Sequence, residues 1–285
     1  MTYYELSVIT NTGYPYYNLT LKGPPNGESI LLRFFDFTSD DSEKVAKLDP
    51  VSSFELNAGL VSALFEFARN INKKIESLEF KSSKKDVLEK NDWNYEGDVL
   101  ITTQTEPYLL HKSVKEKIKL IYDTVIANKL PLDSALEMLQ NEEDNIIEIL
   151  TDVEARTRIK MHETELQRVA NDFLTEMNNY GLQSICITSF DLSPLTIYGN
   201  KYSLNDINAI LRNTGNFPNI PPLEWIYRQS HTLNDQIWVY IIKSGVGPSV
   251  YGLFEPYFYL LFSDPQSYLG EFPGKLTTKF NQILG

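Results

Sequence analysis

The stretch Tyr4-Glu5-Leu6-Ser7-Val8-Ile9-Thr10 alternates apolar with polar side chains, which is the period of a half-buried β-strand. Asn11-Thr12-Gly13 follows with residues typical of a tight turn. Tyr16-Tyr17-Asn18-Leu19-Thr20-Leu21 then returns as a second strand. The chain therefore begins with a predicted hairpin, and we expect the elements that follow to extend it into a mixed α+β fold.

A helix is predicted next, over residues 54–69, because apolar side chains recur there every three or four positions. These side chains are Leu56, Leu60, Ala63, Leu64, Phe67 and Ala68. Other strands are expected at 75–80 and 98–103, with a further strand beginning at 108–110, while 30–35 either extends the sheet or packs beneath a loop. An amphipathic helix over 112–127 closes this half of the chain.

Residues 181–285 repeat the plan with shorter elements. Strands are predicted at 182–188, 195–198, 225–227, 237–242 and 257–262. Helices are predicted at 204–211, with Ser203 placed as the N-cap, and within 268–284 after Pro273. The proline-rich loop 217–222 departs from a compact plan, and it leaves open a single larger sheet shared by both halves.

The middle segment, 129–180, is rich in helix formers and carries a net charge of −7 out of the total of −12. Its apolar stripe is interrupted by the mostly polar stretch 154–165, so it lacks the sustained heptads of a coiled coil. We expect a helical connector that packs on its neighbours at both ends. The alternative is an exposed helix that pairs with a second copy or lies in a partner's groove.

At 285 residues with 42% apolar content, the chain is long enough for two cores. We expect two small domains at 1–128 and 181–285, joined by the acidic helical linker 129–180. The sequence has neither a long apolar run for a membrane span nor the basic start and apolar centre of a signal peptide, which predicts a cytoplasmic protein with no integral membrane segment. The lone cysteine, Cys186, lies in an apolar run and is interpreted as a buried strand residue.

Charge and motifs exclude several function classes. A net-negative chain without a basic stripe argues against nucleic acid and against anionic lipid, because both need clustered Lys and Arg. His111, His162 and His231 lie far apart, and 161–165 lacks the second histidine of a helical metal motif. The glycine-rich segment 245–252 has the wrong spacing for a dinucleotide loop. We therefore predict no catalytic, cofactor or metal residues and no bound cofactor.

The order strand–strand–helix–strand–strand–(strand)–helix resembles the longin and roadblock-type domains that accompany small GTPases. The resemblance is carried by the hairpin 6–15, the helix 54–69 and the strand 75–80, and more weakly by 182–284. It implies two tandem domains, each a mostly antiparallel sheet packed by helices. It also implies a non-enzymatic scaffold or regulator, with a Ras-like small GTPase or another longin/roadblock-type subunit as partner, in regulation of the membrane-traffic type.

The surface expected to bind the partner is the opening hairpin with the helix 54–69. Its predicted contact residues are Tyr14, Tyr16, Tyr17, Leu56, Leu60 and Phe67. The 17 tyrosines and 15 phenylalanines could furnish such a surface, or equally fill two small cores. A homodimer is a further option.

Two rival functions stay open at this point. One is a ligand-sensing module with a small-molecule pocket between sheet and helix. The other is an enzyme on an unfamiliar αβ fold, with a cleft that gathers His231, Asp235, Tyr227 or Arg228.

Overall fold

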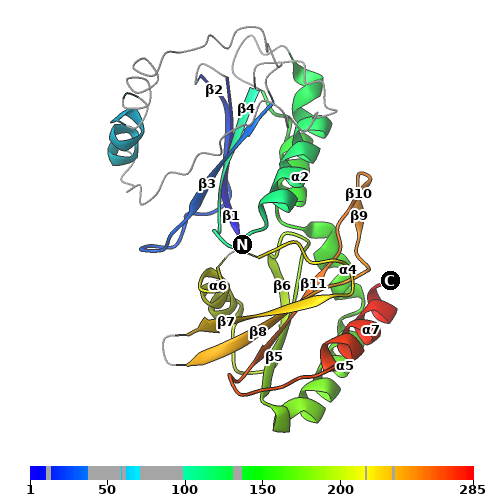
Figure 1. Cartoon of the computed structure of the whole chain (residues 1–285). Helices are drawn as coiled ribbons and strands as arrows, with labels where there is room; N and C mark the ends of the chain where they lie inside the picture. The colour runs from blue at the N-terminus through cyan, green and yellow to red at the C-terminus, as the bar shows by residue number, and fades with distance from the viewer. Residues whose placement is uncertain are drawn as a thin grey trace, which may run out of the picture. The chain divides into compact units, whose positions relative to one another are not determined.

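The computed structural model describes residues 1–10, 14–37, 59, 62–70, 99–130, 137–215, 217–232 and 235–285. The chain divides into two compact units, one of Met1–Phe37 with Gly97–Gly285 and one of Thr38–Glu96. In the second unit, the described residues 62–70 are helical, in agreement with part of the predicted helix 54–69. The predicted strand 75–80 lies outside the described residues. The elements below belong to the first unit (Figure 1).

The first sheet has four antiparallel strands in the order β2-β1-β4-β3. These are β1 (Tyr3–Thr10), β2 (Pro15–Thr20), β3 (Leu31–Asp36) and β4 (Val99–Thr105). The alternation predicted for β1 appears in its burial, since Leu6 and Val8 are fully buried while Ser7 and Ile9 are partly exposed. In the same way β4 alternates between buried and half-buried side chains, which leaves one face of the sheet in the core.

The helix α2 (His111–Ile121) continues as a π-helical turn, Tyr122–Ile126, and a 3₁₀ turn, Ala127–Lys129, which matches the predicted closing helix. It packs on β3 and the residue after it: the His111 ring stacks on Phe35 at a centroid distance of 5.8 Å, and Tyr122 stacks on Phe37 at 4.3 Å. The sequence stripe of Val114, Ile118 and Ile121 is fully buried. This helix therefore supplies the apolar side that the first sheet needs.

The prediction that a strand begins at 108–110 is wrong, because these residues form a turn. The Leu109 carbonyl accepts a hydrogen bond from the Arg33 guanidinium at 2.7 Å, and the Leu110 N–H donates to the Asp191 carbonyl at 3.2 Å. A side chain and a distant loop thus satisfy the backbone groups that a neighbouring strand would have bonded. Sequence periodicity cannot register such partners.

In the described part of the middle segment, three helices follow: α3 (Gln140–Leu150), α4 (Val153–Met161) and α5 (Glu163–Met177), the last ending in the 3₁₀ turn Asn178–Tyr180. Both α3 and α5 bury an apolar stripe, whereas in α4 only Ala155 and Ile159 are buried. This agrees with a segment that packs at its ends and is wetter in the middle. Side chains from α4 and α5 join the core of the second sheet. The boundaries 1–128, 129–180 and 181–285 stay a prediction.

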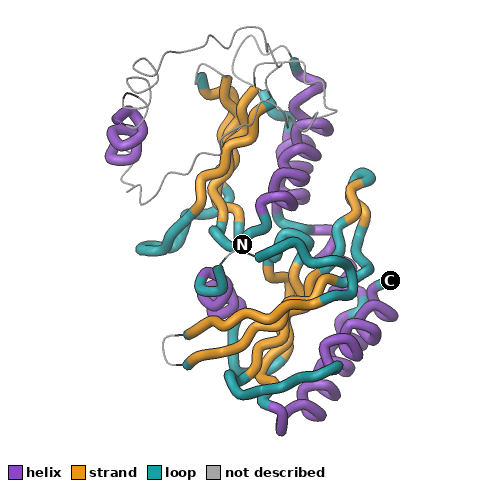
Figure 2. The backbone as a smooth tube through the Cα atoms, in the orientation of Figure 1, coloured by secondary structure: helices purple, strands orange, loops and turns teal. Residues whose placement is uncertain are grey.

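The second sheet has five antiparallel strands in the order β6-β5-β11-β8-β7. Figure 2 shows its strands in orange, with helices in purple beside them. They are β5 (Leu182–Thr188), β6 (Pro194–Tyr198), β7 (Trp225–His231), β8 (Gln236–Lys243) and β11 (Phe258–Ser263). A small hairpin of β9 (Ser249–Val250) and β10 (Leu253–Phe254) is inserted before β11. Every residue of β11 is buried, and burying one such large apolar side chain contributes about 1.5–3 kcal/mol.

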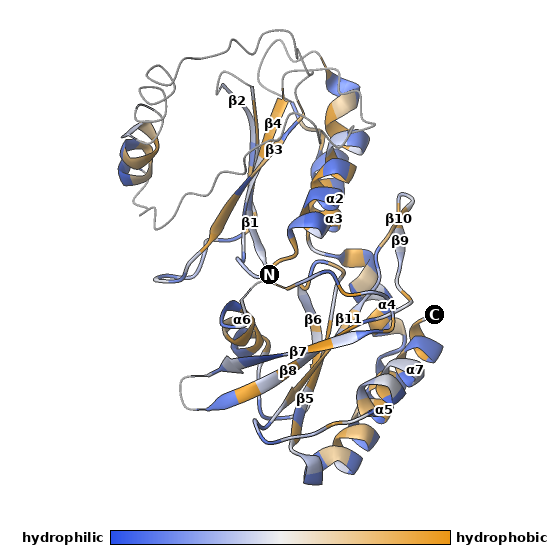
Figure 3. Cartoon of the chain, in the orientation of Figure 1, coloured by the Kyte–Doolittle hydropathy of each residue, from blue (hydrophilic) through white to orange (hydrophobic). Residues whose placement is uncertain are grey.

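Helices cover both faces of this sheet (Figure 1). One face carries α5 and α7 (Phe272–Leu284), whose side chains Phe173 and Phe280 share a core cluster with Tyr259 and Leu261. The other carries α6 (Leu204–Arg212), and Ser203 caps it as predicted, in a reciprocal pair of hydrogen bonds with Asp206. Cys186 is fully buried in β5, also as predicted. The hydrophobic residues concentrate in the central strands and the inner helix faces (Figure 3).

The fold class is thus confirmed at the level of a mixed αβ protein with antiparallel sheets packed by helices. Within the described residues, no helix combines the length and the apolar character needed to cross a membrane.

Candidate functional site

A fully buried lysine joins three distant parts of the chain. Lys117, on α2, donates to Asp152 Oδ1 at 2.6 Å and to Asp191 Oδ2 at 2.7 Å. The side chains of all three residues are at most 1% exposed. The Lys117 ammonium also lies 5.2 Å from the ring centroid of Tyr3 and 5.4 Å from that of Phe190. Charges in such a dry setting are retained only when their partners are close and well aligned.

Asp191 is the better-bonded of the two carboxylates. Beside Lys117, it accepts hydrogen bonds from Tyr3 Oη at 2.7 Å, from Ser189 Oγ at 2.6 Å and from the Ser193 N–H at 2.8 Å. Burial by itself would raise the pKa of Asp191, but the Lys117 charge and these donors outweigh it and hold the pKa well below its usual range. Asp191 is therefore a permanently charged anchor for the lysine.

Asp152 has a different environment. It lies between α3 and α4 in the left-handed region, with φ 57° and ψ 42°, which breaks the helix at that residue. Its Oδ1 is bonded to Lys117, whereas its buried Oδ2 has no hydrogen-bond partner within the described part of the chain. Burial, only partly offset by Lys117, raises the pKa of Asp152 to about 6. One oxygen of this carboxylate is thus available for a further donor.

A third carboxylate, Glu255, approaches the same cluster from the segment after β10. It is 4% exposed. Burial, together with the nearby negative charges of Asp152 and Asp191, raises the pKa of Glu255 to about 8 against the opposing effect of Lys117. Gly247 permits this placement, since a Cβ there would lie 2.0 Å from the Glu255 carbonyl oxygen.

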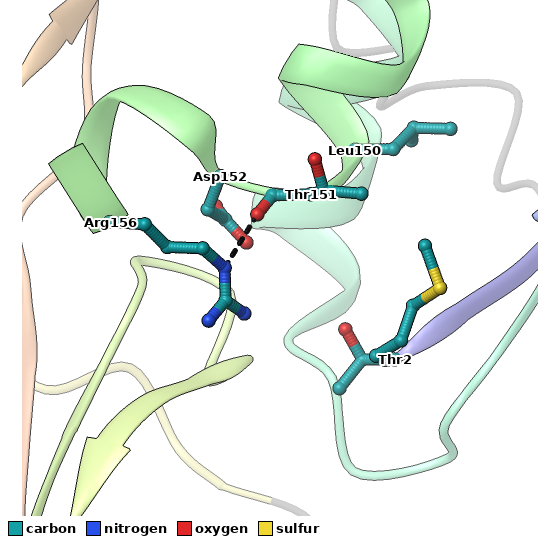
Figure 4. Close-up of a pocket in the computed structure, with 6 residues that line it drawn as sticks. Thr2, Leu150, Thr151, Asp152 and Arg156 are labelled. Atoms are coloured by element: carbon teal, nitrogen blue, oxygen red, sulfur yellow. Dashed lines mark hydrogen bonds between the residues drawn. The ribbon is translucent and has the colours of Figure 1, made fainter.

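Two cavities meet at Asp152. The first, of about 260 Å³, is lined by Met1, Thr2, Leu150, Thr151, Asp152 and Arg156 (Figure 4). Arg156 Nε donates to the Thr151 carbonyl at 2.9 Å, as the dashed line in Figure 4 shows, so this guanidinium is held on the backbone. The second, of about 240 Å³, is lined by Glu148, Ile149, Asp152, Val153, Glu154, Ser249, Val250, Tyr251 and Glu255.

A second charged cluster lies at the end of β4. Arg212, on α6, makes a bidentate contact with Glu106 at 2.6 and 2.7 Å, and its third nitrogen lies 3.2 Å from Glu28. Glu106 is 1% exposed and also accepts a hydrogen bond from Tyr4. All the hydrogen-bonding groups here are matched, so this cluster is a structural contact between the two sheets of the unit.

The structure describes four of the six predicted partner-binding residues, and their joint surface stays a prediction. Tyr14 is exposed and contacts Tyr16 edge to face at a centroid distance of 5.8 Å. Tyr17 is half-buried, and its hydroxyl donates a hydrogen bond to Glu143 on α3 at 2.8 Å, so this side chain connects β2 with α3. Phe67 is 56% exposed, in the other unit. Leu56 and Leu60 lie outside the described residues.

The structure also describes the residues that the sequence offered as candidates for metal binding, dinucleotide binding or catalysis. Among the described residues, no three His, Cys, Asp or Glu side chains are grouped as metal ligands. The segment 245–252 leads into the β9–β10 hairpin, not into a helix. His231 and Asp235 flank the β7–β8 turn, while Tyr227 and Arg228 lie along β7. None of these four residues lines either cavity at Asp152.

Sequence reasoning missed Lys117, Asp152, Asp191 and Glu255, although two of them leave a signal. Lys117 occupies a position on the apolar stripe of its helix, three residues after Val114 and four before Ile121, where a charge is unexpected. Asp191 stands between Phe190 and Leu192, both buried. A charged residue at a core position implies a buried partner, but the pattern does not say which one. No family model, curated protein or solved structure matches the chain.

Proposed function

We propose that this protein is a non-enzymatic scaffold or regulator whose partner is a Ras-like small GTPase or another longin/roadblock-type subunit. The observation that carries the proposal is the order of elements in residues 182–284. It runs β5, β6, α6, β7, β8, β11 and α7, with the short β9–β10 hairpin as an insertion. This is the strand–strand–helix–strand–strand–strand–helix order on which the resemblance rests, and it is a fold analogy.

In the first half, β3 follows the hairpin directly and precedes the helical residues 62–70. Most of residues 38–98 lie outside the described residues, whereas nearly all of 182–284 is described, so the order of elements can be compared with the resemblance only in the second half. The partner-binding proposal accordingly gives more weight to the second sheet.

Edge strands offer the means of contact. β7 ends the second sheet, and its Trp225 and Tyr227 are 38% and 55% exposed. Among the described strands, β3 ends the first sheet, and its Leu32 and Phe34 are 42% and 60% exposed. An edge strand presents backbone N–H and C=O groups to which a partner can add a strand, and adjacent apolar side chains add affinity. If exchange on a GTPase is promoted, it follows from holding the switch loops open, which needs shape and no catalytic residue.

The experiment is a pull-down from native lysate with the full chain as bait, followed by mass spectrometry and by binding of the purified candidate. Tyr227→Lys and Phe34→Lys place a charge on each edge. Tyr268→Lys is the matched control, because Tyr268 is 83% exposed and lies outside both sheets. We expect a small GTPase or longin-type subunit with wild type and control, and at least ~10-fold weaker binding for one edge variant.

Two results would refute the proposal. One is a wild-type pull-down that contains neither class of protein. The other is recovery that neither edge variant reduces, since the edges would then play no part in the contact.

A ligand-sensing function is the second candidate, and the two cavities at Asp152 favour it. They bring a buried carboxylate with an unbonded oxygen next to space for a small group. Convergent polar groups in a concave site are the usual mark of ligand binding.

A further inference from the structure

The cavity between α3, α4 and the β9–β10 hairpin is strongly acidic. Of its nine lining residues, four are carboxylates, namely Glu148, Asp152, Glu154 and Glu255, and none is Lys or Arg. Glu148 and Glu154 are exposed and form the rim, while Asp152 and Glu255 are each 4% exposed and form the floor. Tyr251 fixes the hairpin to α3, since its hydroxyl donates to Asn145 Oδ1 at 2.6 Å.

Acidic clusters on protein surfaces are common, but the floor of this cavity contains a buried carboxylate oxygen without a donor among the described residues. Asp152 Oδ2 is buried and accepts no hydrogen bond within the described chain, although Oδ1 of the same carboxylate is bonded to Lys117. A buried carboxylate oxygen without a donor costs free energy. Because Asp152 lines the cavity, this oxygen indicates that a donor from outside the fold belongs there.

The lysine of the cluster cannot fill this role. Lys117 Nζ is already bonded to Asp152 Oδ1 and to Asp191 Oδ2, and it lies against the rings of Tyr3 and Phe190. The carboxylates that approach Lys117 from three parts of the chain outnumber its single positive charge. The cluster therefore keeps an excess of negative charge beside the cavity.

The shape of the site selects an organic cation. The described residues hold no group of three side chains placed to ligate a metal ion, whereas about 240 Å³ is ample for an ammonium or guanidinium group on its alkyl stem. Ile149, Val153 and Val250 offer apolar walls for that stem. Such groups carry several N–H donors, which match separate carboxylate oxygens better than one point charge does.

We propose that this cavity binds a basic group, an alkylammonium or alkylguanidinium, with the floor carboxylates Asp152 and Glu255 as acceptors and the rim glutamates as electrostatic attraction. The proposal specifies the ligand class for the second candidate function. It is independent of the partner proposed for the edge strands, so either can fail without the other.

The test is calorimetric titration of the full chain at constant ionic strength with four probes. These are n-butylammonium, n-butylguanidinium, N-acetyl-lysine methylamide and tetramethylammonium, which has the charge but no N–H donor. We expect one saturable site per chain for at least one N–H-bearing cation, with tetramethylammonium at least ~10-fold weaker. Binding of the blocked lysine as tightly as butylammonium identifies a protein side chain as the source, and binding of the alkyl cations alone identifies a small amine.

Substitutions of the lining carboxylates test whether the cation binds in this cavity. Glu255→Gln keeps the shape and removes a charge from the floor, and the double variant Glu148→Gln/Glu154→Gln removes the rim charges without touching the buried cluster. Each is expected to weaken binding at least several-fold, about 5- to 10-fold. Glu176→Gln, an exposed glutamate on α5, is the matched control and should bind as wild type does. The proposal is overturned by equal binding of all four probes, by no saturable binding at probe concentrations on the order of 10 mM, or by unchanged binding in both cavity variants.

Discussion

At the scale of single residues, two aspartates that share one lysine differ because of their other partners. Asp191 has three further donors and its pKa falls, whereas Asp152 has none at Oδ2 and its pKa rises. Burial is nearly the same for both and Lys117 acts on each, but Asp191 has the additional donors, while the negative charge of Asp191 adds to the rise in the pKa of Asp152. The lysine is held charged between them, since their charges more than offset the effect of burial on its pKa.

Replacing the lysine should unfold much of this core. Lys117→Met leaves two carboxylates buried without their cation, and we expect a loss of about 3–5 kcal/mol in the free energy of unfolding, measured by urea denaturation. The control is Lys119→Met on the same helix, whose half-exposed pair with Asp123 should contribute no more than about 0.5 kcal/mol. Equal losses in the free energy of unfolding in the two variants would mean that the buried cluster stabilises the fold no more than the exposed pair does.

Glu255 should make stability depend on pH. Burial raises its pKa from an ordinary 4.5 to about 8 in the folded chain, with Lys117 opposing the rise and the negative charges of Asp152, Asp191 and Glu116 adding to it. Between these values the folded state holds a proton that the unfolded state has lost, so the free energy of unfolding falls as pH rises from about 4.5 to about 8.

Glu255→Gln cannot ionise and should remove part of that slope, a difference of at least about 1 kcal/mol between pH 5 and pH 8 by urea denaturation. Asp152, with its raised pKa, keeps a smaller slope of the same sign below pH 6. Glu154→Gln, an exposed neighbour, should keep the wild-type profile. A Glu255→Gln profile that follows wild type would show that the carboxyl ionises freely in the folded chain.

At the scale of elements, the β9–β10 hairpin depends on one glycine. The main chain of Gly247 passes so close to Glu255 and Pro256 that a Cβ would lie 2.0 Å from one backbone atom and 2.8 Å from another. The contact sets where Glu255 enters the cluster, because the Glu255 N–H also donates to the Pro248 carbonyl at 3.0 Å.

Gly247→Ala should therefore be costly, by about 2–4 kcal/mol in the free energy of unfolding, since the backbone must move and cannot relax like a flexible side chain. Gly23→Ala is the matched control: a Cβ at Gly23 meets nothing within 4 Å. Thermal and urea unfolding of both variants measure the difference. A Gly247→Ala protein as stable as the control would show that the hairpin shifts at little cost.

At the scale of the whole first unit, two charged clusters tie the sheets together. Lys117 connects α2 with the β5–β6 turn, and Arg212 connects α6 with the end of β4. Both contacts join residues more than 70 positions apart in the sequence. We expect the two sheets of this unit to unfold in one transition, because losing either sheet leaves a buried carboxylate without its cation.

The Arg212 contact allows a matched comparison around a single side chain. Arg212→Met leaves the buried Glu106 unpaired and should lower the free energy of unfolding by about 2–4 kcal/mol. Glu28→Gln removes only the exposed partner, and should change it by less than about 1 kcal/mol. Urea denaturation followed by both fluorescence and circular dichroism gives the two values. Non-coincident curves for wild type would contradict the single transition.

The sequence by itself determined the local elements. Period-two alternation located β1 and β4, three- and four-residue spacing located α2 and α5, and Ser203 as an N-cap located the start of α6. These signals work because strand and helix geometry act over a few neighbouring residues. Only the tertiary structure decided that Lys117, Asp152, Asp191 and Glu255 form one cluster beside an acidic cavity. Their meeting depends on how strands and helices pack over long sequence distances, and no local period records it.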